Sequence, residues 1–232
     1  MSSSPTSHTA RAGVPPIDAL LRLVGPDRLS SYGLPSHDRA YAVQLYLWNL
    51  ELSSAIFRDI AIGEVVIRNA CHDQLTARCL STIGTPEWYE HLPLSDRDQR
   101  EVAQAKVRIT RARRVVTPGR IVAELTLGFW RYLHSARHES TLWTPSLRHA
   151  YPFMSPQHRA DVASRLDDLN LLRNRIAHHE PIHALEIGDS NLDVVGVHGE
   201  LLEVLNWIDP AVSNWLKSWS RVPTVLATRP KD

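Results

Sequence analysis

The chain has 232 residues, of which 43% are hydrophobic and 22% are charged, so it is long and apolar enough to fold around a core. Its formal net charge of +1 excludes an overall basic field that would attract nucleic acid or a membrane surface. The segment MSSSPTSHTARAGVPP lacks the apolar core of a signal peptide, and no stretch of about eighteen uncharged apolar residues occurs.

The two cysteines, Cys71 and Cys79, lack the partners of a disulfide framework or a zinc knuckle, which favours a reducing compartment. Together with the absence of apolar spans, this predicts a globular, cytoplasmic protein that does not enter a membrane. We expect residues 1–14 to form a loose tail, because this segment is rich in serine and carries no apolar periodicity.

Helical periodicity begins at Ile17, where PPIDALLRLV predicts a short helix that starts at its prolines. From Asp38 to about Cys79, apolar residues recur every three or four positions. This pattern predicts one long helix, or two helices with a bend near Gly63. No segment shows the strict alternation that is typical of strands, so the predicted fold class is all-α.

The second half of the chain carries further helix signals. SDRDQREVAQAKVRITRAR opens with Ser95 as a capping residue and then turns polar and basic. TPGRIVAELTLGFWRYLHSA starts at Thr117 and becomes strongly apolar, and TLWTPSLRHAYP predicts a short helix or turn. Later helices are expected from Ser155 with Pro156, over 191–207 and over 210–219. These elements predict one all-α domain over residues 15–222 and a tail at 223–232.

The helix that opens at Ser155 ends in LRNRIAHHEP, which concentrates titratable side chains. At about 100° per residue, one face is apolar and is expected to meet the core: Leu166, Leu169, Ile176 and Ala177. About a quarter turn away lies a polar face: Asp167, Asn174 and His178. Arg173 is about 140° from His178, so one helix alone does not aim both side chains at one ligand. Two such helices facing each other in a homodimer would bring both residue types to one cleft.

Arginine and histidine together are sufficient for RNA cleavage without a metal ion. A guanidinium matches the charge and geometry of phosphate, and a histidine takes the proton from the ribose 2′-hydroxyl that attacks the phosphorus. A second acid, such as the histidine of the other copy, protonates the departing 5′-oxygen. Asn174 is placed to orient the imidazole or to hold a phosphate oxygen.

The segment LLRNRIAHHEPI resembles the signature of Abi-like proteins of the HEPN superfamily, an Arg and a polar residue followed a few positions later by a His. Arg173, Asn174 and His178 satisfy this signature and would be the catalytic residues. LYLWNLELSSAIFRDIAIGEVVIRNA (45–70) and VAELTLGFWRYL (122–133) look like the family's first conserved helix pair and its central apolar helix. The resemblance, to the abortive-infection AbiD/AbiF-type branch, therefore covers most of the chain.

The resemblance implies a HEPN-like helical bundle, here with additional N-terminal and C-terminal helices, that forms a homodimer. It also implies a metal-independent endoribonuclease without a cofactor, acting in phage defence or as a toxin, with RNA as substrate and an antitoxin protein or RNA as a further partner. Some members of the superfamily bind RNA or protein without cleaving it. A non-catalytic module of the same fold is therefore the alternative.

Other interpretations of the cluster stay open. Arg173 and His178 would also stabilise a helix C-terminus through their positive charge, with Pro181 as the stop. His179 and Glu180 are auxiliary candidates for the site. The three histidines of HHEPIH suggest a metal-dependent enzyme, but adjacent helical histidines point apart and the third lies beyond a proline, so no metal ligands are predicted.

Two further groups of charged residues can be interpreted either as parts of a functional site or as ordinary surface residues of a helix. Glu64 and Arg68 are auxiliary candidates, although their spacing of four also predicts an ordinary intrahelical ion pair. The basic run KVRITRARR offers candidates for RNA contact, although a charged run is commonly a solvated face. These candidates are Arg111, Arg113 and Arg114.

Three predictions concern the interior. Glu124 would need a partner such as an arginine if it were buried among its apolar neighbours, and Gly128 is a candidate for close helix packing. The seven tryptophans are expected to make core or dimer contacts rather than base-stacking platforms.

Overall fold

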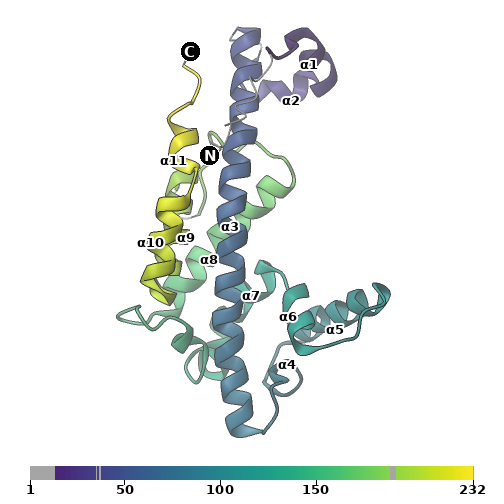
Figure 1. Cartoon of the computed structure of the whole chain (residues 1–232), viewed down its shortest axis with the longest axis vertical. Helices are drawn as coiled ribbons and strands as arrows, with labels where there is room; N and C mark the ends of the chain where they lie inside the picture. The colour runs from purple at the N-terminus through teal and green to yellow at the C-terminus, as the bar shows by residue number, and fades with distance from the viewer. Residues whose placement is uncertain (1–13, 35, 37, 189–191, 232) are drawn as a thin grey trace, which may run out of the picture. The chain divides into compact units, whose positions relative to one another are not determined.

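The structure is a computed structural model that describes residues 14–34, 36, 38–188 and 192–231. Residues 1–13 of the expected N-terminal tail and residue 191 of an expected helix lie outside the described residues. Within them the chain forms α-helices and short 3₁₀ and π turns, and the only extended pairing is one antiparallel bridge between Ile187 and Leu192 (Figure 1). The predicted all-α class is confirmed.

The described chain divides into two compact units, which are treated separately. The smaller unit comprises the residues up to Leu50 and those from Thr228 onward. Inside it, the rings of Tyr32 and Tyr46 meet edge to face at 5.3 Å. Its helices are α1 (Ile17–Val24), α2 (Pro26–Ser30) and the first part of α3 (Arg39–Thr82).

The larger unit, Glu51–Ala227, holds the rest of α3 and the segments that carry all the candidate site residues. Its other helices are α4 (Trp88–His91), α5 (Asp96–Arg111), α6 (Pro118–Glu124), α7 (Leu127–Leu133), α8 (Arg159–Ala177), α9 (Val194–Ile208), α10 (Pro210–Trp219) and α11 (Val222–Leu226). Between α7 and α8 lie three single turns, η1 (Ala136–His138), η2 (Glu139–Trp143) and η3 (Leu147–Ala150).

Aromatic side chains fill part of the core of the larger unit. Trp88 of α4 contacts Phe129 and Trp130 of α7, with ring centroids 6.3 and 5.8 Å apart, and all three are fully buried. The prediction that tryptophans form the core holds for these positions. Trp215 and Trp219 are exposed instead and stack on each other along α10, with centroids 5.4 Å apart.

The long apolar pattern forms one continuous helix, α3, which passes through Gly63 without a break. A side chain at Gly63 would collide with Leu201 of α9. The glycine therefore serves the close approach of α9 rather than a bend in α3.

The prediction of one apolar helix from Thr117 is wrong, because the structure has two. Helix α6 ends at Glu124, Leu125 and Thr126 are extended, and α7 begins at Leu127. The carboxylate of Glu64 accepts a hydrogen bond of 2.9 Å from the backbone N–H of Leu127. This bond satisfies one donor at the new helix start, and it comes from a residue distant in the sequence.

The helix expected from Ser155 with Pro156 begins later, at Arg159. The side chain of Gln157 donates hydrogen bonds to the carbonyls of Arg148 and Tyr151, at 3.0 and 2.9 Å. These bonds tie Gln157 to η3 and the residue after it, ahead of the first turn of α8.

The predicted core face of α8 is confirmed at Leu166, Leu169 and Ile176, which are buried. Ala177 is exposed, so its assignment to the core was wrong. The reason is its position, because it is the last residue of the helix and the chain turns away directly after it.

The C-terminal helices follow the prediction closely, with α9 starting at Val194 and α10 spanning Pro210–Trp219. The sequence did not predict the short helices α2, α4 and α11, which are only four or five residues long. None of the helices in the described ranges is both long and apolar enough to span a bilayer. The domain limits expected from the sequence stay a prediction.

Helices α8 and α9 pack against each other and bring two carboxyl groups together. Burial raises the pKa of Glu200 to about 7, and the negative charge of Asp168, which also hydrogen-bonds to Glu200, acts in the same direction. Arg165 opposes this rise and forms an ion pair with Glu203, with Nε and Oε2 2.5 Å apart. Between about pH 4.5 and 7, Glu200 therefore stays protonated in the folded protein, whereas in the unfolded chain it would be ionised.

This raised pKa predicts a pH-dependent stability. Between about pH 4.5 and 7 the folded state binds more protons than the unfolded state, so the free energy of unfolding falls as pH rises. Glu200→Gln should remove that contribution and raise the stability at about pH 8 by ~1–2 kcal/mol, a value reduced for solvent screening. Urea unfolding of both proteins at about pH 5 and pH 8 measures it. An equal difference at the two pH values would contradict the prediction.

Candidate functional site

The predicted catalytic residues lie at the C-terminal end of α8. Arg173 and Asn174 are half-buried in its last turns, and His178 is the capping residue and is exposed. Nη1 of Arg173 donates a long hydrogen bond of 3.4 Å to Oδ1 of Asn174, and no ion pair of Arg173 occurs within the described part of the chain. A guanidinium and an imidazole are therefore accessible to a ligand on the same stretch of helix.

The polar face predicted for α8 is confirmed. Asp167 and His178 are exposed and Asn174 is half-buried, and the three share one side of the helix. Asp167 is held by an ion pair with Arg131 of α7. Leu171 lies on the same side with 41% of its surface exposed, which places an apolar side chain beside the polar ones.

The chain leaves α8 through a tight turn at His179, whose φ of 58° is left-handed. The backbone N–H of His179 donates to the carbonyl of Ile176 at 3.0 Å, and that of Glu180 donates to the carbonyl of Arg175 at 2.9 Å. This pair of bonds is a Schellman motif, in which glycine commonly occupies the left-handed position. The backbone positions of both candidate histidines, His178 and His179, are thus fixed by the hydrogen bonds of the helix end.

The same turn determines where the nearby acid goes. Glu180 folds back onto α8, and its Oε2 lies 2.7 Å from Nη1 of Arg175. The acid is thereby paired with Arg175 and not with Arg173. Of the two auxiliary candidates in this segment, Glu180 neutralises the charge of Arg175. His179 is exposed and follows His178 directly.

The left-handed histidine predicts a gain in stability on substitution. A non-glycine residue in this conformation costs about 1 kcal/mol, so His179→Gly should raise the free energy of unfolding by ~0.5–1 kcal/mol. Thermal and urea unfolding measure the change. His179→Ala, which keeps the backbone cost, is the matched control and should not be stabilised. A glycine variant no more stable than the alanine variant would contradict the prediction.

Glu64 is connected to α8 only indirectly, through the start of α7. It bonds to Leu127, and the next residue, Gly128, faces Asn170 of α8, since a Cβ on Gly128 would lie 3.5 Å from Oδ1 of Asn170. Asn170 precedes Asn174 by one helical turn. The carboxylate of Glu64 is occupied by the backbone of α7, and the contact at Gly128 is of ordinary length rather than unusually close.

Arg68 does not form the intrahelical ion pair that its spacing from Glu64 suggested. Its Nε instead donates a hydrogen bond of 3.3 Å to Oδ1 of Asn69. Glu64 thus has a structural role at the start of α7. The structure gives Arg68 no comparable role in the fold.

The RNA-contact candidates Arg111, Arg113 and Arg114 lie at the end of α5 and in the turn that follows it, and all three are exposed. Helix α5 packs on α6, whereas α8 packs on α7. In Figure 1, α5 and α6 stand apart from α8, with α7 between them. The structure therefore does not bring these arginines to His178.

A buried polar cluster, which the sequence did not reveal, joins Cys71, His134 and Tyr151. Nδ1 of His134 bonds to the carbonyl of Trp130 at 2.8 Å, so Nε2 accepts a hydrogen bond of 2.9 Å from the Tyr151 hydroxyl. Burial lowers the pKa of His134 to about 4 and raises the pKa of Cys71 to about 12. Since all three side chains are fully buried, they join α3, α7 and η3 and are closed to a substrate.

Two buried histidine–aspartate pairs were also not predicted. Nε2 of His198 lies 2.9 Å from Oδ2 of Asp59, and Nε2 of His138 lies 3.1 Å from Oδ2 of Asp98. Ser220 donates its hydroxyl to the same carboxylate oxygen of Asp59. In a hydrolytic triad the serine would bond to the histidine, so this arrangement stabilises the fold and does not activate a nucleophile.

Across the described ranges, no group of three or more His, Cys, Asp or Glu side chains is arranged to hold a metal ion. Glu124, which we expected to need a cationic partner if buried, is half-buried, and its Oε2 lies 3.0 Å from Nε of Arg108. In comparisons with known proteins, no family model, no curated protein and no solved structure matches the chain.

Proposed function

We propose that this protein is an Abi-like, HEPN-type endoribonuclease that cleaves RNA without a metal ion. The observation that supports it most is the end of α8, where Arg173 and His178 are accessible, Asn174 lies between them, and the neighbouring acid is bound to a different arginine. Among the clusters described above, this one places on the same helix end an exposed histidine and a half-buried arginine that forms no ion pair with any residue the structure describes.

The reaction begins when the imidazole of His178 accepts the proton of a ribose 2′-hydroxyl. The freed oxygen attacks the adjacent phosphorus and forms a bond to it, while the bond to the 5′-oxygen breaks. An imidazolium, supplied by His178 of a second copy, gives its proton to the leaving oxygen. The guanidinium of Arg173 binds the phosphate oxygens, on which negative charge increases in the transition state. The products are a 2′,3′-cyclic phosphate and a 5′-hydroxyl.

A homodimer is part of this proposal. Arg173 and His178 are about 140° apart around α8, so one copy does not present both to one phosphate. The exposed side chain of Leu171 shares the face of Asn174 and His178 and offers an apolar contact for a twofold-related helix. A symmetric pair would place an arginine and a histidine from each copy in one cleft.

The resemblance in sequence supplies the proposed biological setting, which is phage defence or a toxin held in check by an antitoxin protein or RNA in the cytoplasm. An enzyme that cuts RNA without a cofactor is suited to this role, because activation then needs only release of the protein or exposure of the site.

The proposal is tested by incubating the purified protein with a single-stranded RNA in excess EDTA and determining the termini of the products. Cyclic phosphate and 5′-hydroxyl ends are expected. A 2′-deoxy substitution at the cleaved nucleotide should block cleavage there, because it removes the attacking oxygen. Cleavage of the deoxy substrate, or cleavage only after a metal is added, would exclude this mechanism.

The second candidate is a non-catalytic RNA-binding or protein-interaction module of the same fold. The observation that favours it is the Schellman motif, which gives the segment His178–His179 a structural role independent of chemistry. Under this alternative the protein binds RNA or forms its dimer and produces no new RNA ends in the same assay.

A further inference from the structure

Helix α5 has a buried face and a basic face. Val102, Ala105 and Ile109 are buried and fix one side of the helix against the larger unit. A second face is polar and mostly basic, with residues three or four positions apart. In order along the helix these are Arg97, Arg100, Gln104, Arg108 and Arg111.

The charge of the chain is unevenly distributed along the sequence. Residues 96–126 contain eight of the 26 Lys and Arg and four of the 25 Asp and Glu, which gives this segment a net charge of +4. The remaining eighteen basic and twenty-one acidic residues give the rest of the chain a net charge of −3. The near-neutral total therefore conceals a basic region formed by α5 and α6.

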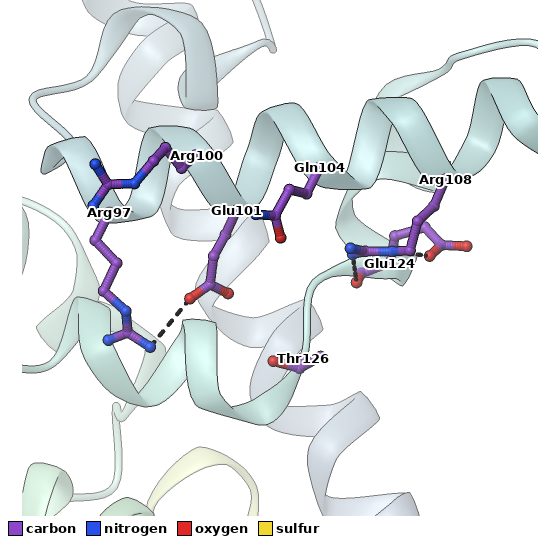
Figure 2. Close-up of a pocket in the computed structure, with 7 residues that line it drawn as sticks. All are labelled: Arg97, Arg100, Glu101, Gln104, Arg108, Glu124 and Thr126. Carbon is purple, nitrogen blue, oxygen red and sulfur yellow. Dashed lines mark hydrogen bonds and ion pairs between the residues drawn. The ribbon is translucent and has the colours of Figure 1, made fainter.

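A cleft of about 510 Å³ opens along the basic face of α5, next to α6 and the start of α7. Figure 2 shows Arg97 and Arg100 at one end, Arg108 with Glu124 at the other, and Glu101, Gln104 and Thr126 between them. The lining thus combines guanidinium, amide and hydroxyl groups, which donate hydrogen bonds, with the carboxylates of Glu101 and Glu124.

Two of the arginines in the cleft are held in place. Nη2 of Arg97 lies 3.1 Å from Oε1 of Glu101, and its guanidinium lies 3.9 Å above the ring of Tyr132. Arg108 is bound both to the carboxylate and to the backbone carbonyl of Glu124, at 3.0 and 2.9 Å. Their orientation is therefore fixed before any ligand arrives.

Arg100 and Arg111, on the same face, are exposed and form no ion pair with the residues that the structure describes. Their positive charge is not neutralised within the fold. An anionic ligand would therefore gain attraction from them without displacing an internal partner.

A second hollow of about 400 Å³ continues the first along α5, since both share Gln104 and Arg108. It extends to Arg111 and includes Val107, which is 47% exposed. At 1.5 Å per residue, the groove from Arg97 to Arg111 is about 21 Å long. This length suits an extended chain of several repeating units better than a single small anion.

We propose that this groove along α5 binds the sugar-phosphate backbone of an RNA strand. Arg100 and Arg111 bind phosphate oxygens in the bidentate manner that guanidinium favours, Gln104 and Thr126 meet ribose hydroxyls, and Val107 contacts a sugar or base. The choice of RNA as the ligand rests on the proposed function. The groove would hold the strand at a distance from His178, as a separate part of the substrate site.

The test measures RNA binding by fluorescence anisotropy in EDTA, with His178→Ala present in every protein so that the RNA stays intact. Arg100→Gln with Arg111→Gln should weaken binding by about tenfold or more. It should also reduce the slope of log K against log salt by about 1.4, since each phosphate contact on a single strand contributes about 0.7. Both side chains are exposed, so the fold should be unaffected, and Arg111→Gln alone should reduce the slope by half as much.

The matched control is Arg148→Gln with Arg221→Gln, which removes two exposed arginines outside the groove. Equal weakening by both double variants would overturn the proposal, as would no weakening by the groove variant. Polyglutamate at the same charge concentration should compete poorly. Competition as strong as that of RNA would identify an acidic protein as the ligand and would also overturn it.

The outcome is separable from that of the proposed cleavage, which is measured with the groove intact. If the protein with His178 cleaves no RNA but the groove variant still binds more weakly, the groove is an RNA site and the nuclease proposal fails. If cleavage occurs and the groove variant binds normally, the nuclease proposal stands and the groove inference fails.

Discussion

Replacement of His178 by alanine is expected to lower the rate of RNA cleavage by ~10²–10⁴-fold, because it removes the group that takes the 2′-hydroxyl proton. The side chain is exposed, and the helix end depends on backbone bonds, so the stability should change little. Initial rates in EDTA measure the effect. His149→Ala, which removes another exposed histidine, in η3, is the matched control and should cleave at the wild-type rate.

Arg173→Lys separates charge from geometry, since lysine keeps the positive charge but cannot bind phosphate through two parallel hydrogen bonds. We expect it to lower the cleavage rate by about tenfold or more. Mixing the wild-type protein with an excess of His178→Ala should lower the cleavage rate below that of the same amount of wild-type protein alone, because a mixed dimer keeps one histidine and lacks either the base or the acid. Cleavage by His178→Ala at the rate of the control would disprove the catalytic assignment.

Asp98→Ala is expected to be the most destabilising single change among those considered, at ~3–5 kcal/mol. The fully buried carboxylate accepts hydrogen bonds from the backbone N–H and hydroxyl of Ser95, at 3.2 and 2.6 Å, and lies 3.1 Å from Nε2 of His138. Its loss removes the capping box of α5 and leaves a buried histidine without its partner. Urea unfolding at neutral pH measures the effect.

The matched control for Asp98 is Asp96→Ala, which removes an exposed acid from the same helical turn and should cost less than about 1 kcal/mol. If the two substitutions were equally destabilising, the buried pair of Asp98 and His138 would contribute no more to the stability of the fold than an exposed acid does. Because α5 carries the basic groove, loss of Asp98 should also weaken RNA binding even though this residue does not touch the groove.

The contribution of Asp98 should depend on pH. Burial alone would raise its pKa, but the hydrogen bonds from His138 and Ser95 outweigh burial and lower the pKa below 3.8. The unfolded chain therefore takes up a proton first as pH falls. The stability that the carboxylate provides should be present above about pH 4 and lost as pH falls through the lower pKa of the folded state.

Local signals were sufficient to predict several elements. Ser95 was identified as the cap of α5, and the structure shows a full capping box with Asp98. Apolar periodicity predicted α3, α8 and α10, because each has a face that must be buried. Glu124 was expected to need an arginine only if buried; it is half-buried and pairs with Arg108.

Other features depend on residues that are far apart in the sequence. The break between α6 and α7 is stabilised by Glu64, and the glycine in the middle of α3 is explained by Leu201 of α9. The buried partners of His138 and His198 lie 40 and 139 positions away. No local pattern indicates such pairings, because histidine and aspartate usually lie at the protein surface and their neighbours in the sequence do not reveal a distant partner.

The candidate site was predictable in part. Arg173, Asn174 and His178 were predicted on one helix end and lie there, but their convergence with a second copy stays a prediction. The basic groove was predicted only in part, because the run KVRITRARR contains its residues Arg108 and Arg111 but not Arg97 or Arg100. The missing signal was the spacing of Arg97 and Arg100, which lie upstream of this run on the same helix.

The reactivity of the Cys71 thiol can serve as a probe of transient unfolding of this protein. The thiol is fully buried, and burial raises its pKa to about 12, so an alkylating reagent can neither reach it nor find it ionised in the folded state. Labelling should therefore proceed only through molecules that have transiently opened. With Cys79 replaced by serine, the rate of modification at Cys71 can follow unfolding without any added dye.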